Sequence, residues 1–176
     1  VQEGSSEWGD IDNDGDLDLI LTGGASGGPT TAIYENQRPP LGPRGFADIS
    51  AGLAGVIGSS SDWGDYDGDG DLDLVVTGNS TATIYENDVA NGNGFTAIGA
   101  GLAGVNSGSS DWGDVDNDGD LDLVVTGDAS GGPLTTAIYT TTIYENQGGG
   151  TFADISAGLT RSEERRVGKE CPSPCR

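Results

Sequence analysis

The chain has 176 residues, enough for one modest domain, and its 29 acidic and 7 basic side chains give a formal net charge of −22. This charge excludes nucleic acids and anionic membrane surfaces as partners, because both attract clustered cations, and no segment is apolar enough to span a membrane. A polyanion instead favours cations as ligands. Because the chain begins at Val1 without a Met, we expect it to be an excerpt from a longer protein.

Three similar segments follow one another from the N-terminus. Each opens on Trp-Gly-Asp and runs through an Asp-rich stretch into Leu-Asp-Leu, then Ile-Tyr-Glu-Asn, a Gly-rich turn and a Phe. The openings lie at Trp8, Trp63 and Trp112. This pattern predicts three repeats, over about 1–54, 55–103 and 104–160.

The residues around Leu-Asp-Leu alternate in polarity. In the first repeat, Leu17, Leu19 and Leu21 alternate with Asp18, Ile20 and Thr22. Side chains of a strand point alternately to opposite faces, so we expect one wholly apolar face and one partly apolar face. Each repeat reads as about four short antiparallel strands, which hold the Trp, the Leu-Asp-Leu, the Ile-Tyr and the Phe. A four-stranded unit of about 50 residues matches a β-propeller blade.

The third repeat is longer between Thr126 and Ile143. TTAIY at 135–139 is followed by TTTIYEN, which nearly repeats it. A hairpin extension and a local duplication both account for this segment.

The Asp-rich stretch is a nine-residue loop with acids at positions 1, 3, 5, 7 and 9. These are Asp10, Asp12, Asp14, Asp16 and Asp18, then Asp65, Asp67, Asp69, Asp71 and Asp73, and then Asp114, Asp116, Asp118, Asp120 and Asp122. Carboxylates at positions 1, 3 and 5 can converge when the chain curls, and the Gly at position 6 tolerates the positive φ of a sharp turn. The carbonyl of position 7 and the side chain of position 9 can complete the roughly six to eight oxygens that Ca²⁺ prefers.

This loop differs from that of an EF-hand. An EF-hand has a bidentate Glu at position 12 between two helices, whereas position 12 here is Leu21, Val76 or Val125 in a predicted strand. Solvated Asp-Gly turns are the alternative to a metal site, but three copies of one ligand pattern favour metal. Magnesium fits less well, since it prefers rigid octahedral sites that retain water. We expect three Ca²⁺ ions, one per loop, that stabilise the fold.

The pattern WGDxDxDGDLDL, with Ile-Tyr-Glu-Asn and the Gly-Phe turn, resembles the FG-GAP/VCBS-type repeat of integrin-α-like β-propellers. The resemblance covers nearly all of residues 1–160. It implies an all-β fold of propeller blades with calcium held at loop positions 1, 3, 5 and 9 and by the carbonyl of position 7. Propellers have about four to eight blades, so about three blades imply an incomplete propeller whose remaining blades belong to the full-length chain.

Residues 161–176 differ in composition from the rest. They contain five of the seven basic residues and both cysteines, Cys171 and Cys175. The stretch RSEERRVGKEC resembles the translation of a sequencing-adapter oligonucleotide, which makes the tail non-native; a disordered natural tail is the alternative. In either case the two cysteines predict neither a disulfide framework nor a metal site.

Repeated residues outside the loops favour packing roles over chemistry. Trp8, Trp63 and Trp112 are either blade-packing anchors or sugar-stacking platforms, and one Trp at the same place in every repeat favours packing. Packing is also the favoured interpretation of Tyr34, Tyr85 and Tyr144, and a solvated strand end that of Glu35, Glu86 and Glu145. The chain has no His, so it contains no Ser-His-Asp triad, and we predict that it is not an enzyme.

The resemblance implies an extracellular protein, secreted or at the cell surface. We expect an adhesion or ligand-binding module whose ligand is a protein or a glycan. The alternative is a calcium-stiffened spacer or an accessory domain of a secreted enzyme.

Overall fold

The computed structural model describes residues 2–37, 45–89, 91–92, 94–130 and 138–159. Within these ranges the chain forms strands and loops, and no helix there is long and apolar enough to cross a membrane. The predicted all-β class is therefore confirmed. The tail at 161–176, both cysteines, and residues 131–137 of the extra segment lie outside the described residues.

In the part of the chain that the structure describes, the strands form three four-stranded antiparallel sheets, each a meander in chain order. We call the sheets blades 1, 2 and 3. Blade 1 holds β1 (Ser6–Gly9), β2 (Asp18–Ala25), β3 (Gly28–Gln37) and β4 (Gly45–Asp48). Blade 2 holds β5 (Ser60–Gly64), β6 (Asp73–Gly78), β7 (Thr81–Asp88) and β8 (Gly94–Ala97). Blade 3 holds β9 (Asn106–Gly113), β10 (Asp122–Asp128), β11 (Tyr139–Asn146) and β12 (Phe152–Asp154). An incomplete propeller of three blades is confirmed.

The three blades share one strand register. In blade 1, Trp8 is paired with Leu19, and Leu19 with Tyr34. The same Trp–Leu–Tyr row recurs in the other blades, as Trp63–Leu74–Tyr85 and Trp112–Leu123–Tyr144. Because a one-residue slip would turn every side chain to the opposite face, this shared register gives corresponding residues the same orientation in every blade.

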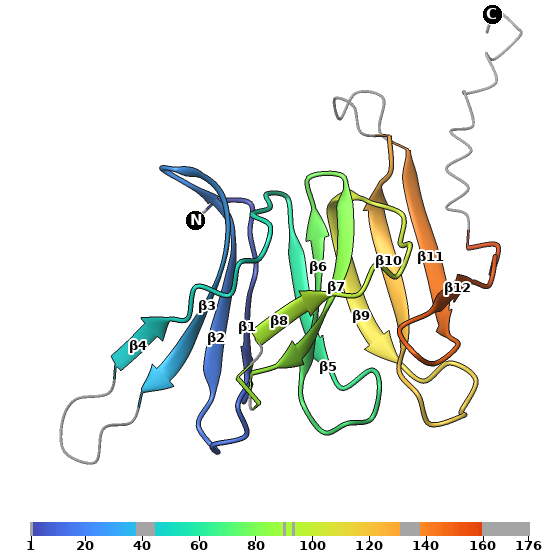
Figure 1. Ribbon diagram of the computed structural model, residues 1–176. Helices are drawn as coiled ribbons and strands as arrows, with labels where there is room; N and C mark the ends of the chain where they lie inside the picture. The colour runs from blue at the N-terminus through green and yellow to red at the C-terminus, as the bar shows by residue number, and fades with distance from the viewer. Residues whose placement is uncertain (1, 38–44, 90, 93, 131–137, 160–176) are drawn as a thin grey trace, which may run out of the picture.

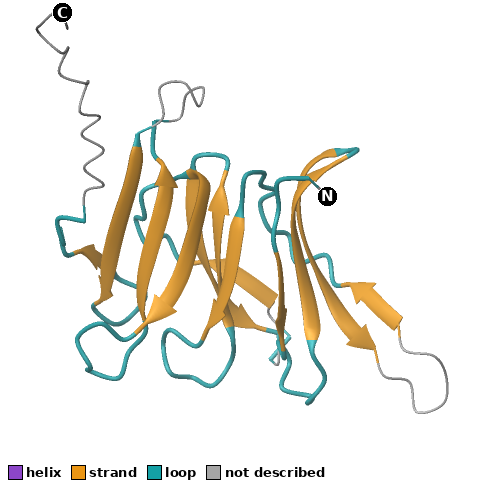
Figure 2. Cartoon of the chain, turned by 180° about the vertical axis from the view of Figure 1, so that it is seen from behind, coloured by secondary structure: helices purple, strands orange, loops and turns teal. Residues whose placement is uncertain are grey.

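The blades stand side by side, and their three Asp-rich loops emerge at one end, the lower edge in Figures 1 and 2. The first strands come together, since β1 contacts β5 and β5 contacts β9. The segments 49–59 and 98–105 lead from the last strand of one blade to the first strand of the next. In each segment a Val, Val56 or Val105, pairs with the preceding blade at Thr30 or Thr81.

The core lies between the blades as two separate clusters of buried apolar side chains. Between blades 1 and 2 are Ile11, Ile20, Ile33, Val56, Leu74, Val76 and Tyr85. Between blades 2 and 3 are Tyr66, Val75, Ile84, Val105, Leu123, Val125, Tyr144 and Phe152. Blade 2 thus packs on blade 3 through the face that holds Val75 and Ile84. It packs on blade 1 through the opposite face, which holds Leu74 and Tyr85.

This arrangement explains why the alternation of residues along a strand does not divide it into one buried face and one solvent-exposed face. All six residues of β6 are buried, because blade 2 has a neighbour on both faces. In β2 the buried large apolar residue is Ile20, whereas Leu19 and Leu21 are only half-buried. Leu17, just before the strand, is 55% exposed. The apolar row of the first blade faces outward, where it has no neighbouring blade among the described residues.

The packing role predicted for the repeated Trp residues is confirmed for two of the three. Trp63 and Trp112 pack against the two interblade clusters. Trp8 contacts Phe46, with ring centroids 6.0 Å apart, but remains 56% exposed on the outward face of blade 1.

Candidate metal centres

Each Asp-rich loop joins the first two strands of a blade. Positions 1 to 8 form the loop, and position 9 is the first residue of the second strand, namely Asp18, Asp73 or Asp122. The Gly at position 6 has the positive φ predicted for it, between 87° and 102° in the three copies. Position 4 also has a positive φ, at Asn13, Gly68 and Asn117, which the sequence analysis did not anticipate. Two left-handed residues thus curl each loop.

The curl brings the carboxylates of positions 1, 3 and 9 together. In each loop one oxygen from each of the three side chains lies within 4.8 Å of the other two. The trios are Asp10, Asp12 and Asp18; Asp65, Asp67 and Asp73; and Asp114, Asp116 and Asp122. Oxygens bound to one Ca²⁺ at about 2.3–2.6 Å are at most about 5 Å apart, so this spacing suits a shared calcium ion.

The position 1 carboxylate also holds the loop in its curled form. Both oxygens of Asp10 accept backbone N–H groups, from Asp14 and Gly15, each at 3.0 Å. Asp65 accepts from Gly68 at 2.8 Å and Gly70 at 3.1 Å, and Asp114 from Asn117 and Gly119 in the same way. These charge-assisted hydrogen bonds organise the loop around its own acidic side chain.

The position 9 carboxylate is buried and ties the loop to the sheet. Asp73 Oδ2 accepts the Tyr66 N–H at 3.2 Å, and its Oδ1 accepts the Asn87 N–H at 2.9 Å. Asp18 and Asp122 make the same two bonds within their own blades. This residue is therefore held by the loop at position 2 and by the third strand of its blade, which fixes its place in each trio.

The carboxylates of positions 5 and 7 are not members of the trios. At position 5, Asp14, Asp69 and Asp118 each use Oδ1 to accept the N–H of position 7, at 2.8–3.0 Å. Each of these acids has a second carboxylate oxygen that can bind a metal ion. The role of position 5 as a calcium ligand therefore stays a prediction. At position 7, Asp71 accepts a hydrogen bond from Asn13 Nδ2 at 2.7 Å, which links the loops of blades 1 and 2.

Crowding of the carboxylates has an electrostatic effect. Desolvation raises the pKa of the position 3 acids Asp12, Asp67 and Asp116, and repulsion from neighbouring loop acids adds to the rise. Burial raises the pKa of Asp73 to about 7, with smaller contributions from Asp67 and Asp69. A divalent cation in the loop would relieve this repulsion, so the hard-oxygen donor set fits calcium.

The Asn of Ile-Tyr-Glu-Asn is a supporting residue that the sequence analysis missed. The side chain of Asn87 donates to the Leu72 carbonyl at 3.0 Å and, across the blade boundary, to the Ile11 carbonyl at 2.9 Å. Asn146 does the same with Leu121 and Tyr66. The signal was present, since Asn ends the motif in all three repeats at Asn36, Asn87 and Asn146. The repeated Asn did not indicate its hydrogen-bond partners across the blade boundary, because the carbonyls of Ile11 and Tyr66 are distant from it in sequence.

With this geometry established, comparison with known proteins gives one structural neighbour of interest. It is a lectin of Agrocybe aegerita, described for its specific recognition of non-reducing terminal N-acetylglucosamine. The match has a TM-score of 0.50 at 22% sequence identity, and it covers 87% of this chain but 38% of the lectin. The likeness therefore concerns the fold, and the chain spans well under half of the lectin's length.

Comparison of sequences gives a family. No curated protein matches the chain significantly. The model of the FG-GAP-like repeat matches it twice, over residues 10–76 and 65–125. Each match starts at position 1 of an Asp-rich loop, and together they cover more than half of the chain. The chain belongs to the FG-GAP-like repeat family.

Proposed function

We propose that this chain is a calcium-binding β-propeller region of a secreted or cell-surface protein, and that it serves as an adhesion or ligand-binding module. The observation that carries the proposal is the trio of carboxylates at positions 1, 3 and 9, which recurs with the same spacing in all three blades. Turns that were merely solvated would not need the same convergence of three carboxylates in all three loops. Each loop binds one Ca²⁺.

Calcium binding at these sites stabilises the fold. Extracellular calcium modules bind with dissociation constants of about 10⁻⁴–10⁻³ M. At free calcium about tenfold above that constant, each site adds roughly 1.4 kcal/mol to the free energy of unfolding, and three sites add about 4 kcal/mol. This is a large part of the roughly 5–15 kcal/mol stability of a typical domain.

A calorimetric titration tests this proposal. The chain is first stripped with a chelator and then titrated with CaCl₂, and the expected stoichiometry is three ions per chain. Asp67→Asn removes a position 3 ligand from blade 2 alone and is expected to leave two ions. The melting temperature is expected to rise with calcium in both proteins, and less in the variant.

The matched control is Glu35→Gln, which removes one negative charge outside the loops. Glu35 lies on β3, whose residues belong to no trio. This variant is expected to bind three ions like the parent chain. A native chain that takes up no calcium, or whose melting temperature is the same in calcium and in chelator, contradicts the proposal.

The ligand is a protein or a glycan, and the likeness to a lectin supports testing glycans first. A glycan array probed with the calcium-loaded chain, including terminal N-acetylglucosamine, separates a binding module from a calcium-stiffened spacer. Binding that disappears with chelator supports the module. Calcium uptake without any glycan or surface-protein ligand supports the spacer.

A further inference from the structure

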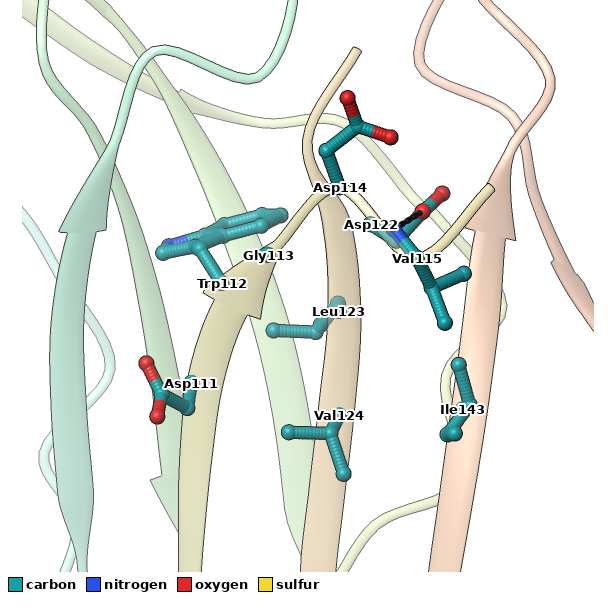
Figure 3. A pocket seen from close by; sticks show the side chains of 9 residues that line it. All are labelled: Asp111, Trp112, Gly113, Asp114, Val115, Asp122, Leu123, Val124 and Ile143. Carbon is teal, nitrogen blue, oxygen red and sulfur yellow. Dashed lines mark hydrogen bonds between the residues drawn. The ribbon is translucent and has the colours of Figure 1, made fainter. Parts of the chain in front are cut away.

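The residue at position 2 of each Asp-rich loop is tied to position 9 of the same loop. Its backbone N–H donates to the position 9 carboxylate, as the dashed line between Val115 and Asp122 shows in Figure 3, at 2.7 Å. The same bond joins Ile11 to Asp18 at 3.0 Å. Position 2 lies between positions 1 and 3, so this bond fixes the backbone that carries the other two members of the trio.

At the two blade boundaries that the structure describes, the following blade holds the other side of position 2. The Ile11 carbonyl accepts the side-chain N–H of Asn87 at 2.9 Å. The Tyr66 carbonyl accepts that of Asn146 at 2.8 Å. Both Asn side chains are buried, so water competes little for these bonds. The geometry of the loops in blades 1 and 2 therefore depends on the blade that follows.

Each of these two Asn residues also binds the trio of its own blade. The backbone N–H of Asn87 donates to Asp73 Oδ1 at 2.9 Å, and that of Asn146 donates to Asp122 Oδ1 at 2.8 Å. Hydrogen bonds therefore link the three trios in one series, which we call the interblade relay. Its members, each at most 5% exposed, are in bonding order Asp18, Ile11, Asn87, Asp73, Tyr66, Asn146 and Asp122.

We propose that the interblade relay couples the calcium sites of adjacent blades, so that calcium binding in one blade strengthens binding in the next. This inference rests on the proposed function, because it requires calcium in the loops. A filled trio fixes its position 9 carboxylate and its position 2 backbone, and these fix the Asn that supports the neighbouring trio. The neighbouring site then loses less conformational freedom when it binds its own ion. Asn87 and Asn146 are positioning residues, since they act through positions 2 and 9.

Charge alone predicts the opposite effect, which makes the two explanations separable. The three carboxylates of a trio with one Ca²⁺ leave a single net negative charge. The blade 2 trio of an Asp67→Asn chain, without its ion, keeps two negative charges. By charge alone, emptying the blade 2 site would therefore tighten binding in blades 1 and 3. The interblade relay predicts that it weakens binding there.

A CaCl₂ titration of the ¹⁵N-labelled chain, followed by NMR, reads each site separately. The position 6 amides of Gly15, Gly70 and Gly119 each donate to the position 1 carboxylate of their own loop, at 3.0–3.2 Å, so each reports one site. In the native chain the three signals are expected to shift together and cooperatively. In the Asp67→Asn chain, Gly15 and Gly119 are expected to need about fivefold more calcium or higher.

Cutting the relay at one boundary at a time assigns the coupling to the two Asn residues. When Asp67→Asn is added to an Asn87→Ala chain, it is expected to weaken the Gly119 site but no longer the Gly15 site. In an Asn146→Ala chain the two responses are expected to be exchanged. Each variant is the matched control for the other, because both remove the same buried side chain and a general loss of stability would not exchange the responses.

A second control separates the buried relay from the surface bond between Asn13 and Asp71. Asn13→Gly removes that bond and introduces the residue that blade 2 has at this position, Gly68, which has the same positive φ. Coupling is expected to persist in this variant. Its loss there would assign the coupling to the surface bond and overturn the proposal.

The titration distinguishes failure of this inference from failure of the proposed function. A native chain that takes up no calcium contradicts the proposed function. A chain that binds three ions independently, or whose Gly15 and Gly119 sites tighten when Asp67 is replaced, overturns the coupling alone. The Asp67→Asn result decides this with both Asn residues intact, so it stands even where an Ala variant does not fold.

Discussion

At the scale of single residues, Asp62 is a half-buried acid that lies near other negatively charged side chains. It lies on β5, and its carboxylate accepts the Trp112 N–H of the next blade. Burial raises the pKa of Asp62 to about 6, and repulsion from Asp111 and Glu7 contributes, although the Trp112 hydrogen bond acts in the opposite direction. The folded chain therefore binds a proton at Asp62 more tightly than the unfolded chain does, and the ionised carboxylate present at neutral pH opposes folding.

The stabilising contribution of a raised carboxyl pKa is complete below the ordinary value of 3.8 and is lost as the pH rises through about 6. We therefore predict that Asp62→Asn raises the melting temperature of the chelated chain at pH 7.5 and changes it little at pH 3.5. The amide oxygen can still accept the Trp112 N–H. Thermal unfolding at the two pH values, with Glu35→Gln as a charge-matched control, measures the effect. An equal change at both pH values would show that the pKa of Asp62 is not the cause.

At the scale of elements, the stability of the fold depends on how the blades meet rather than on any one sheet. Each of the two clusters takes its buried residues from two adjacent blades. One close approach is that of Trp112 to Gly64 at the end of β5, where a Cβ would lie 2.7 Å from a ring carbon. Neither blade can move away without exposing its apolar face.

We predict that Gly64→Ala destabilises the chain by about 1–3 kcal/mol, because overpacking displaces the Trp112 ring. Gly9→Ala should cost less, since its Cβ would lie 3.1 Å from Trp63. Gly27→Ala, at an open turn, should be nearly neutral. Urea unfolding monitored by Trp fluorescence gives the three values. If Gly64→Ala is as stable as Gly27→Ala, the Trp–Gly contact does not hold blades 2 and 3 together.

At the scale of the whole molecule, the charge of −22 acts against the compact state. The Asp-rich loops lie at one end of the blades, as Figures 1 and 2 show, so their negative charges are gathered there. Screening shortens the reach of exposed charges from about 30 Å at 0.01 M salt to about 3 Å at 1 M. One bound Ca²⁺ would act more locally, because its two positive charges offset two of the three negative charges of a trio.

We predict that NaCl raises the melting temperature of the chelated chain by several degrees between 10 mM and 0.5 M, because it screens the self-repulsion. The rise should be smaller in saturating calcium, where bound ions would already offset part of the loop charge. Differential scanning calorimetry measures both series. A melting temperature that falls with salt, or rises equally with and without calcium, would argue against loop repulsion as the source.

Much of the fold and of the candidate site was predictable from local pattern. The repeated Trp, Leu-Asp-Leu, Ile-Tyr and Phe segments predicted four strands per blade, and the structure confirms them. The Gly at position 6 has the predicted positive φ. The position 5 acids lie outside the trios, and one oxygen of each accepts the backbone N–H two residues ahead. The spacing of acids along the sequence does not show which of their carboxylates converge in space.

The strands and the acidic loops follow from short stretches of neighbouring residues, and the repeats follow from the recurrence of these stretches along the chain. Which faces of the blades are buried became known from the three-dimensional packing. Leu19, Leu74 and Leu123 occupy the same position of their blades, yet Leu74 and Leu123 are fully buried and Leu19 is not. The difference arises because burial here depends on the presence of a preceding blade, which is a property of the assembly and not of the local sequence.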